Sequence, residues 1–350
     1  MPAAAADVLV LGAGPVGCAL ALALKETNLK VRILEKKSKP SPFRPIALSY
    51  ASRLILERLG VWDGLAPTPI ETIHVSQAGA FGRTRMDAAD AGVPSLGYVV
   101  ELSTLEETLR TKVGKFLVSE PLDALCTVHA EGVSPEAKET PYEQEAIVGL
   151  VTTEPAAGKE AFERFTPEGP LALLPLGGRY ALIWSTRPER AQALAAMPEA
   201  DFLAALAAAA GRRPGRPVAV EGRAVQKLAL RVRPARVEAR AVYIGNAAQT
   251  LHPVAGQGLN LGLRDAWELA QIWRDAQDPG DAALLARYAA RRRLDAEATI
   301  RVTHWLAGGF TGGNRLSRIA RGAALTALDV LPGPRRFFAR RMIYGPSALP

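Results

Sequence analysis

The chain opens with a short hydrophobic run, a glycine-rich turn and a second hydrophobic run. Residues 8–11 are wholly apolar, which is typical of a parallel strand that is buried on both faces. A turn over residues 12–17 follows, residues 18–25 continue as a helix, and residues 31–34 form the next apolar run. The pattern predicts a strand, a turn, a helix and a second strand, as in α/β folds with a parallel sheet.

The turn itself reads Gly12-Ala13-Gly14-Pro15-Val16-Gly17, a GxGxxG motif placed between a strand and a helix. Gly12 permits the tight turn, Gly14 lets a pyrophosphate approach the backbone, and Gly17 lets the helix pack against the strand. Glu35 ends the second strand at the spacing where an acidic residue accepts hydrogen bonds from ribose hydroxyls. We therefore predict a dinucleotide site here, with a purely structural turn as the alternative.

The middle of the chain changes to short strands separated by turn residues. A hairpin is expected around residues 77–79, and an alanine-rich helix over residues 198–210. Residues 114–145 contain only short apolar pieces and a polar stretch with two prolines. Strands are predicted over residues 73–76, 80–84, 146–153, 161–165, 171–176, 179–184 and 224–232.

A second glycine motif lies late in the chain. A short strand over residues 241–244 leads to a turn on Gly245 and Asn246, and a loop after Pro253 opens a helix near Leu259. Gly256 and Gly258 remove side chains, so the backbone can come close to a ligand, and the free N–H groups of the helix start face it. The stretch predicts a second half of a cofactor site, with a plain strand-turn-helix as the alternative.

The C-terminal part is helical, over residues 264–276 and 282–306, and then amphipathic. Apolar residues recur at helical spacing between arginines: Leu316, Ile319, Ala323, Ala327 and Leu331. A helix with apolar and basic faces can lie on a membrane surface. The alternative is a helix packed on its own domain.

Charge and cysteine content narrow the class of protein. The net charge of +8 arises from 43 Lys and Arg against 35 Asp and Glu, but no zinc finger, base-stacking motif or recognition helix accompanies it. We expect no nucleic-acid binding, and assign the charge to anionic lipid, a partner surface or an arginine-rich genome. Cys18 and Cys126 form no disulfide framework or metal-ligand spacing, so we expect a cytoplasmic protein without a metal. We expect neither a signal peptide nor a membrane-spanning run.

Residues 12–17 with Glu35, and residues 245–266, together resemble the class A flavin-dependent aromatic hydroxylases, whose FAD site is built from both ends of the chain. The segments at residues 44–50, 81–87, 96–101, 162–167 and 171–176 look like the ubiquinone-biosynthesis hydroxylases, and the 2-polyprenyl-6-methoxyphenol hydroxylase branch resembles the chain most. The resemblance implies an enzyme that uses FAD, NAD(P)H and O2 to hydroxylate a polyprenyl phenol.

The resemblance also implies an α/β fold in which a Rossmann-like FAD-binding domain is interleaved with a smaller β-sheet substrate domain. Residues 1–72, 98–145 and 233–276 would form the FAD-binding domain. Residues 73–97 and 146–232 would form the substrate domain, and residues 277–350 a helical C-terminal region. Other ubiquinone-synthesis proteins and the inner membrane would be its partners.

Particular residues acquire expected roles from the resemblance. Asn246 would contact the ribityl chain and Pro253 would lie beside the isoalloxazine. Arg44 is expected at the FAD phosphates or, alternatively, in a solvated loop. His252 is the one catalytic candidate, with a structural histidine as the alternative. Backbone N–H groups would face the pyrimidine edge of the flavin at Gly256, Gln257, Gly258, Leu259 and Asn260.

Two departures from the family keep other functions open. The family has an Asp-Gly motif where this chain offers at best His129-Ala130-Glu131-Gly132, within a shortened segment. Relatives often carry Arg before a helix where this chain has Leu102-Ser103-Thr104. The alternatives are a non-catalytic paralogue that serves as a scaffold, and a flavin hydroxylase of another aromatic substrate.

Overall fold

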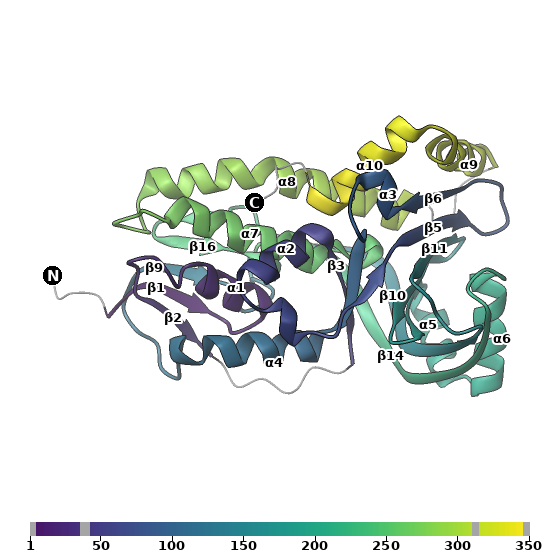
Figure 1. The fold of residues 1–350 in the computed structure, drawn as a ribbon, viewed down its shortest axis with the longest axis horizontal. Coiled ribbons are helices and arrows are strands. Elements are labelled where there is room, and N and C mark those ends of the chain that lie inside the picture. The colour runs from purple at the N-terminus through teal and green to yellow at the C-terminus, as the bar shows by residue number, and fades with distance from the viewer. Residues whose placement is uncertain (1–4, 36–42, 310–314, 346–350) are drawn as a thin grey trace.

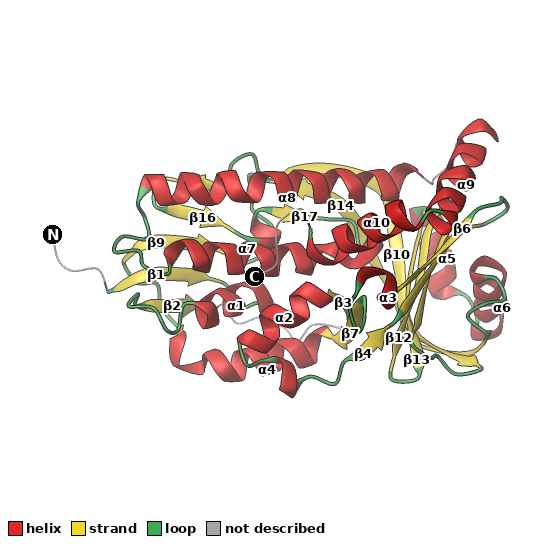
Figure 2. Ribbon diagram, turned by 45° about the horizontal axis from the view of Figure 1, so that its top comes forward, coloured by secondary structure: helices red, strands yellow, loops and turns green. Residues whose placement is uncertain are grey.

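A computed structural model describes residues 5–35, 43–309 and 315–345 of the chain. Its two large sheets lie at opposite ends of an elongated molecule (Figure 1). Two long helices, α7 (Gln257–Trp273) and α8 (Ala282–Gly309), pack along each other on the side of the first sheet (Figure 2). The fold is the expected α/β architecture with a helical C-terminus.

The first sheet has six strands, in the order β15-β16-β9-β1-β2-β8. All neighbouring pairs are parallel except β15 with β16. Parallel strands buried on both faces require apolar residues throughout, which explains the unbroken run in β1. The strands are β1 (Ala6–Leu11), β2 (Val31–Leu34), β8 (Leu117–Val118), β9 (Ala124–His129), β15 (Val237–Glu238) and β16 (Ala241–Tyr243).

Helices cover this sheet and share one hydrophobic core with it. Buried residues of α1 (Pro15–Ala23), α4 (Leu102–Val113), α7 and α8 join those of β1, β2, β9 and β16 in a single cluster. Trp273 of α7 and Tyr288 of α8 are among the largest fully buried side chains. Because the core draws on residues from both ends of the chain, the N-terminal and C-terminal motifs are held in one rigid unit.

The second sheet has eight strands, in the order β17-β14-β10-β13-β12-β11-β5-β6, and only β11 and β5 pair in parallel. One face is covered by α5 (Pro188–Ala196) and α6 (Glu199–Ala210), which bury residues such as Ile147, Leu171 and Leu182. The strands are β5 (Thr72–Gln77), β6 (Arg83–Asp87), β10 (Lys138–Glu154), β11 (Glu160–Thr166), β12 (Gly169–Leu176), β13 (Arg179–Thr186), β14 (Arg216–Val232) and β17 (Gln249–Thr250).

Smaller elements join the two halves. A three-stranded sheet, β3 (Pro45–Ser49), β7 (Gly97–Glu101) and β4 (Thr68–Ile70), lies between them and carries α2 (Tyr50–Arg58). Helix α9 (Arg315–Val330) packs on β6, and α10 (Pro332–Tyr344) packs on α3 (Ala88–Ala91). Single 3-10 turns occur at Trp62–Gly64, Gly114–Phe116, Gly245–Ala247 and Val254–Gly256.

Several element boundaries differ from the sequence predictions. The second hairpin strand starts at Arg83 rather than at residue 80, because Gly79 and Gly82 both take positive φ and lengthen the turn. Strand β10 starts at Lys138 and pairs with β14 from there, so the domain boundary expected at residue 145 falls inside a strand. Helix α5 was not predicted, and α7 begins at Gln257, two residues before the predicted start.

The amphipathic C-terminal segment does not pack as its apolar spacing suggests. Ile319, Ala323, Ala327 and Leu331 are exposed, whereas Gly322 and Leu325 are buried. The side chain of Leu316, the first residue of the predicted stripe, lies outside the described residues. Helix α9 therefore packs through the face beside the predicted apolar stripe. In the described part of the chain, no helix has the length and apolar content to cross a membrane.

Candidate active site

A cavity of about 1370 Å³ lies between the two large sheets. The carboxyl ends of β1, β2, β9 and β16 all open into it, through Gly12, Glu35, Ala130 and Gly245. Ligands of open α/β sheets bind at this edge of the sheet. The opposite wall is one face of the eight-stranded sheet. The cavity therefore has one end lined by the glycine turns at the strand ends and another end lined mostly by apolar side chains.

Two of the three fingerprint glycines line the cavity and the third does not. A Cβ added at Gly14 would meet no atom within 4 Å, so the backbone there is open to the cavity. A Cβ at Gly12 would lie 2.7 Å from the Cα of Glu131, and one at Gly17 would lie 2.2 Å from the carbonyl oxygen of Gly12. Gly12 and Gly17 are therefore required for close backbone packing.

The shortened segment within residues 114–145 still supplies a strand, β9, and the loop after it to the cavity. Val128 of β9 pairs with Val10 of β1, and Ala130, Glu131 and Gly132 line the cavity beside the first glycine turn. Gly132 takes φ of +108°, and an added Cβ would meet nothing within 4 Å. Glu131-Gly132, the best sequence match to the family's Asp-Gly motif, thus lies at the cavity.

Glu35 is paired with an arginine that the sequence did not identify. Arg110 of α4 contacts both carboxylate oxygens, with Nη2 at 2.9 Å from Oε2. Glu35, Arg44 and Arg110 all line the cavity. Arg110 lies seven residues after Ser103, which also lines the cavity, so both occupy one face of the helix. A search for basic residues at this helical spacing would have found it.

The second glycine motif packs directly against the first. Val16 lies between Gly245 and Gly262, because a Cβ on Gly245 would meet its side chain at 3.1 Å and one on Gly262 at 2.7 Å. Gly256, at the N-cap of α7, takes φ of +60°. A Cβ added there would lie 2.9 Å from the Cβ of Ala47. Gly258 has open space in place of a side chain and faces the cavity.

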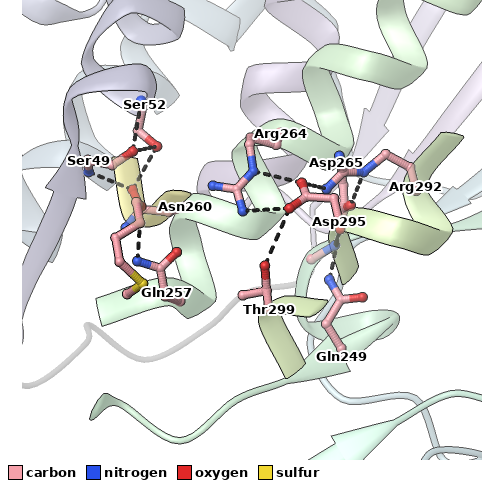
Figure 3. Close-up of polar contacts among 12 residues, drawn as sticks. Ser49, Ser52, Gln249, Gln257, Asn260, Arg264, Asp265, Arg292, Asp295 and Thr299 are labelled. Atoms are coloured by element: carbon pink, nitrogen blue, oxygen red, sulfur yellow. Dashed lines mark hydrogen bonds and ion pairs between the residues drawn. The ribbon is translucent and has the colours of Figure 1, made fainter. Parts of the chain in front are cut away.

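Of the predicted flavin-side residues, all line the cavity: Asn246, Pro253, Gly256, Gln257, Gly258, Leu259 and Asn260. The side chain of Asn260 is fully used by the protein (Figure 3). Its Oδ1 accepts from the Ser49 N–H at 2.8 Å and the Ser52 hydroxyl at 2.7 Å, while Nδ2 donates to the Ala47 carbonyl at 2.9 Å. Asn260 therefore fixes α7 to β3 and α2.

A buried ion network holds the turn after β16 in place (Figure 3). Asp265 of α7 accepts from the Gly245 N–H at 3.2 Å and from Nε of Arg292 on α8 at 2.8 Å. Asp295 of α8 accepts from Nε of Arg264 at 2.8 Å and lies 2.8 Å from Nη2 of Arg292. Burial alone would raise the pKa of Asp295, but Arg264 and Arg292 together lower it. The network was not predicted from the sequence.

His252 lines the cavity with both ring nitrogens already bonded. Nδ1 accepts from the Val254 N–H at 3.1 Å, so Nε2 carries the proton and faces Oε1 of Gln144 at 3.2 Å. Burial lowers the pKa of His252 to about 4, which keeps the ring neutral. This geometry is that of a structural histidine, the alternative stated for it above.

The sheet wall of the cavity is apolar over most of β10 to β13, and its polar residues come from β6, β11, β14 and β17. Its apolar side chains come from alternate positions of β10 to β13, such as Val148, Ala172 and Ile183. Glu163 of β11 and Thr84 of β6 stand among them, and Oε1 of Glu163 and Oγ1 of Thr84 are buried without a hydrogen-bonding partner in the described part of the chain. Burial raises the pKa of Glu163 to about 7.

Glu163 and Thr84 lie in one row across the sheet. Glu163 pairs with Val75 on β5, and Val75 pairs with Thr84 on β6. Strand-to-strand spacing places the two polar side chains roughly 10 Å apart on the same face. Sequence reasoning missed both, although an acidic residue at an inward position of a strand is a recognisable signal.

The C-terminal helices close the apolar end. Trp305 and Leu306 of α8, Leu325 and Leu328 of α9, and Phe338 of α10 line the cavity. Gly345 follows the last residue of α10, and a Cβ there would lie 2.6 Å from Oδ1 of Asp295. The cover of the cavity is therefore fixed to the same buried network as the glycine turn.

Comparison with solved structures identifies the fold. The p-nitrophenol 4-monooxygenase PnpA from Pseudomonas putida DLL-E4 matches with a TM-score of 0.77 and 16% identity, over 98% of this chain and 99% of that one. Klebsiella pneumoniae HpxO, complexed with FAD and uric acid, matches with a TM-score of 0.73 and 16% identity, over 95% and 97%. The fold is that of an FAD-dependent monooxygenase.

Sequence comparison defines the family. Residues 5–145 and 126–303 match the family described as FAD binding domain. The ubiquinone hydroxylase UbiL of Rhodospirillum rubrum is 31% identical over 96% of this chain and 89% of its own length. The 3-demethoxyubiquinol 3-hydroxylase of Escherichia coli is 30% identical over 83% and 86%. The chain belongs to the FAD-dependent hydroxylases of ubiquinone biosynthesis, as its motifs predicted.

Replacing Asp295 with alanine should lower the free energy of unfolding by about 3–5 kcal/mol at pH 7. Arg264 and Arg292 would then stay buried with a missing partner, which is the costly way to break a buried ion pair. Urea unfolding measures the loss. Asp275→Ala, which removes an exposed carboxylate, is the control. A loss equal to that of the control would contradict the role given to the network.

The ion pairs of Asp295 with Arg264 and Arg292 also predict that the stability of the protein depends on pH. Because the pKa of Asp295 lies below its ordinary value of 3.8, its stabilisation is fully present above that value and is lost as the pH falls through the lower pKa of the folded state. The Tm of the wild type should therefore drop below about pH 4 more steeply than that of Asp295→Ala. Parallel curves for the two proteins would exclude this contribution.

Proposed function

We propose that the chain hydroxylates a polyprenyl phenol in ubiquinone biosynthesis, with FAD as cofactor and NAD(P)H and O2 as co-substrates. One observation carries the proposal: a single cavity joins two glycine motifs at the strand ends to an apolar sheet face. The first part suits a dinucleotide cofactor and the second an apolar substrate. The names of the relatives, ubiquinone hydroxylase and 3-demethoxyubiquinol 3-hydroxylase, support the substrate class.

The residues that line the cavity fit FAD. Gly14, Gly132 and Gly258 each have open space where a side chain would stand, so the backbone is accessible along the nucleotide end. In the proposed binding mode Gly12 and Gly14 face the pyrophosphate, with Arg44 and Arg110 as its basic partners. Glu35 receives the adenosine ribose, and Asn246 with Pro253 and residues 256–260 hold the flavin. Bound FAD would supply the transfer of electrons from NAD(P)H to O2.

The chain's own groups would bind and orient the phenol. Among the polar residues of this wall, Oε1 of Glu163 and Oγ1 of Thr84 have no hydrogen-bonding partner in the described part of the chain, so a ring hydroxyl would contact them. An ionised Glu163 would take up the phenolic proton and make the ring more electron-rich. The cover formed by α8, α9 and α10 would keep water from the reacting atoms.

The site also suggests how a membrane-embedded substrate reaches it. Helix α9 lines the cavity through Leu325 and Leu328, and presents Ile319 to solvent with 47% of its surface exposed. Phe337 on α10 is 72% exposed and lies beside the exposed Arg336. Exposed apolar and basic residues on these two helices suit peripheral contact with an anionic membrane.

Cofactor binding should be lost on Gly14→Leu while the fold is kept. Gly14 has φ of −75°, which leucine adopts freely, and its side chain would project into the cavity space proposed for FAD. Absorbance of the purified protein after reconstitution with FAD measures binding. Gly158→Leu, which places the same side chain in open space outside the cavity, should bind like the wild type.

Two outcomes would contradict the enzymatic function. A wild-type protein that stays colourless after reconstitution would exclude an FAD enzyme. Restoration of ubiquinone by Gly14→Leu in a deletion strain would favour the scaffold function, since scaffolding does not need FAD. Accumulation of an intermediate unrelated to ubiquinone in that strain would point to another aromatic substrate.

Glu163→Gln should reduce kcat/KM and remove the acidic limb of its pH profile. Because the pKa of Glu163 is raised to about 7, the wild type should gain activity as the pH rises through that value and the carboxyl ionises. Glutamine keeps the size but cannot accept the proton. Glu189→Gln, on an exposed part of α5, is the matched control, and an unchanged limb in Glu163→Gln would remove Glu163 from the mechanism.

Membrane contact predicts that Ile319→Asp weakens binding to vesicles that contain anionic phospholipid. Loss of one inserted apolar side chain and gain of a negative charge should reduce partitioning about tenfold, as about 1.5 kcal/mol is the lower value for burying such a side chain. Vesicle cosedimentation measures it. Leu294→Asp on α8 changes another exposed apolar residue and should have little effect; equal losses in both would contradict contact through α9.

A further inference from the structure

A second, smaller cavity lies behind the active-site wall. Its volume is about 420 Å³, and it lies between the β5–β6 hairpin and the loop after α6, at the end of the molecule opposite the N-terminus (Figure 1). Along β5, Ile73 and Val75 face the active-site cavity whereas His74 and Ser76 line the second one. The side-chain alternation of the strand therefore places the two cavities on opposite faces of the same sheet.

Four arginines from three elements line this second cavity: Arg83, Arg164, Arg212 and Arg213. No aspartate or glutamate is among the described residues that line it. Arg83, Arg212 and Arg213 make no ion pair within the described part of the chain, and Nε of Arg164 is buried without a partner. Most other arginines near this sheet are paired, as Arg179 is with Glu221 at 3.1 Å.

The pKa of His74, which lines this cavity, is affected by the arginines of the same cavity. Only 5% of the residue is exposed, and its Nε2 is buried without a partner in the described residues. Burial, followed by the charges of Arg213 and Arg83, lowers the pKa of His74 to about 4. The acidic residue that opposes them, Asp329, does not line the cavity, and its carboxylate accepts from the Arg85 N–H at 2.9 Å.

Close packing holds two backbone segments of the cavity wall in place. Gly211 takes φ of +78°, and its missing side chain leaves room for the Arg164 guanidinium, 3.3 Å from where a Cβ would stand. The hairpin is held against α9, because a Cβ on Gly82 would lie 2.5 Å from the Cα of Gly322. The backbone that carries the arginines is therefore held in place, and binding would order the exposed side chains of Arg83, Arg212 and Arg213.

We propose that this second cavity is a binding site for a phosphate group. Guanidinium groups bind phosphate oxygens through paired, charge-assisted hydrogen bonds, and several arginines with no acidic partner suit a doubly charged anion. The volume falls within the range of roughly 300–1,000 Å³ for small-molecule sites. The phosphate belongs either to a soluble phosphorylated molecule or to the headgroup of an anionic phospholipid, since Phe81 at the hairpin tip is 55% exposed.

The test uses protein saturated with FAD, so that phosphate does not bind at the proposed pyrophosphate site. Calorimetry with inorganic phosphate and with pyrophosphate, against sodium chloride of equal ionic strength, measures soluble ligands. Cosedimentation with phosphatidylglycerol-containing vesicles, against phosphatidylcholine alone, measures the lipid. Arg212→Gln/Arg213→Gln removes two exposed arginines of the cavity, and Arg274→Gln/Arg293→Gln removes two exposed arginines elsewhere, with the same change in net charge.

A soluble source predicts a one-site phosphate or pyrophosphate isotherm that weakens at least about tenfold in Arg212→Gln/Arg213→Gln and is unchanged in the control. A lipid source predicts that binding to phosphatidylglycerol vesicles falls by a similar factor in that variant alone and that pyrophosphate competes with it. Either result supports the site. If neither measurement separates the two double variants, the proposal is wrong, whatever the outcome for FAD binding and hydroxylation.

Discussion

The geometry of the active site depends on one buried group of charges on α7 and α8. Removing four charges from water costs several kcal/mol per ion, so such a group persists only when every member is paired. Asp265 meets this condition by binding the Gly245 N–H, Gln249 and Arg292 at once. The turn after β16 and the two helices must therefore take their positions together. Because Gly345 packs on Asp295, the end of α10 is set by the same condition.

The eight-stranded sheet serves two cavities because its side chains alternate. Residues such as Ile147 and Leu182 bury one face against α5 and α6, while Val148 and Ile183 form the wall of the active-site cavity. On the cavity face Glu163 stands among apolar side chains, its Oε1 is buried without a partner in the described part of the chain, and burial raises its pKa. The same alternation directs Arg164, the next residue, to the arginine-lined cavity behind the sheet.

The parts of the structure that were predicted from the sequence are those that local backbone geometry fixes. Gly12, Gly14 and Gly256 could be assigned because a tight turn or an open backbone demands glycine at those positions. Arg110, Glu163 and the Asp265–Arg292 pair could not, since each depends on a partner or a cavity made by distant parts of the chain. The predicted strand over residues 146–153 lies within β10, but its N-terminal part was not predicted because Lys138 and its neighbours are polar yet pair along β14.

Helix α9 lines the active-site cavity on one side and is exposed to solvent on the other. Its inner residues, Leu325 and Leu328, line the apolar end of the cavity, and Ile319 and Val330 on its outer side face solvent. The contact between Gly322 and Gly82 also attaches it to the hairpin that borders the arginine-lined cavity. A phosphate group in the proposed second site would therefore contact the hairpin that packs on α9, without entering the active-site cavity. With the proposed membrane contact through α9, a substrate with a long apolar chain would enter the cavity past this helix.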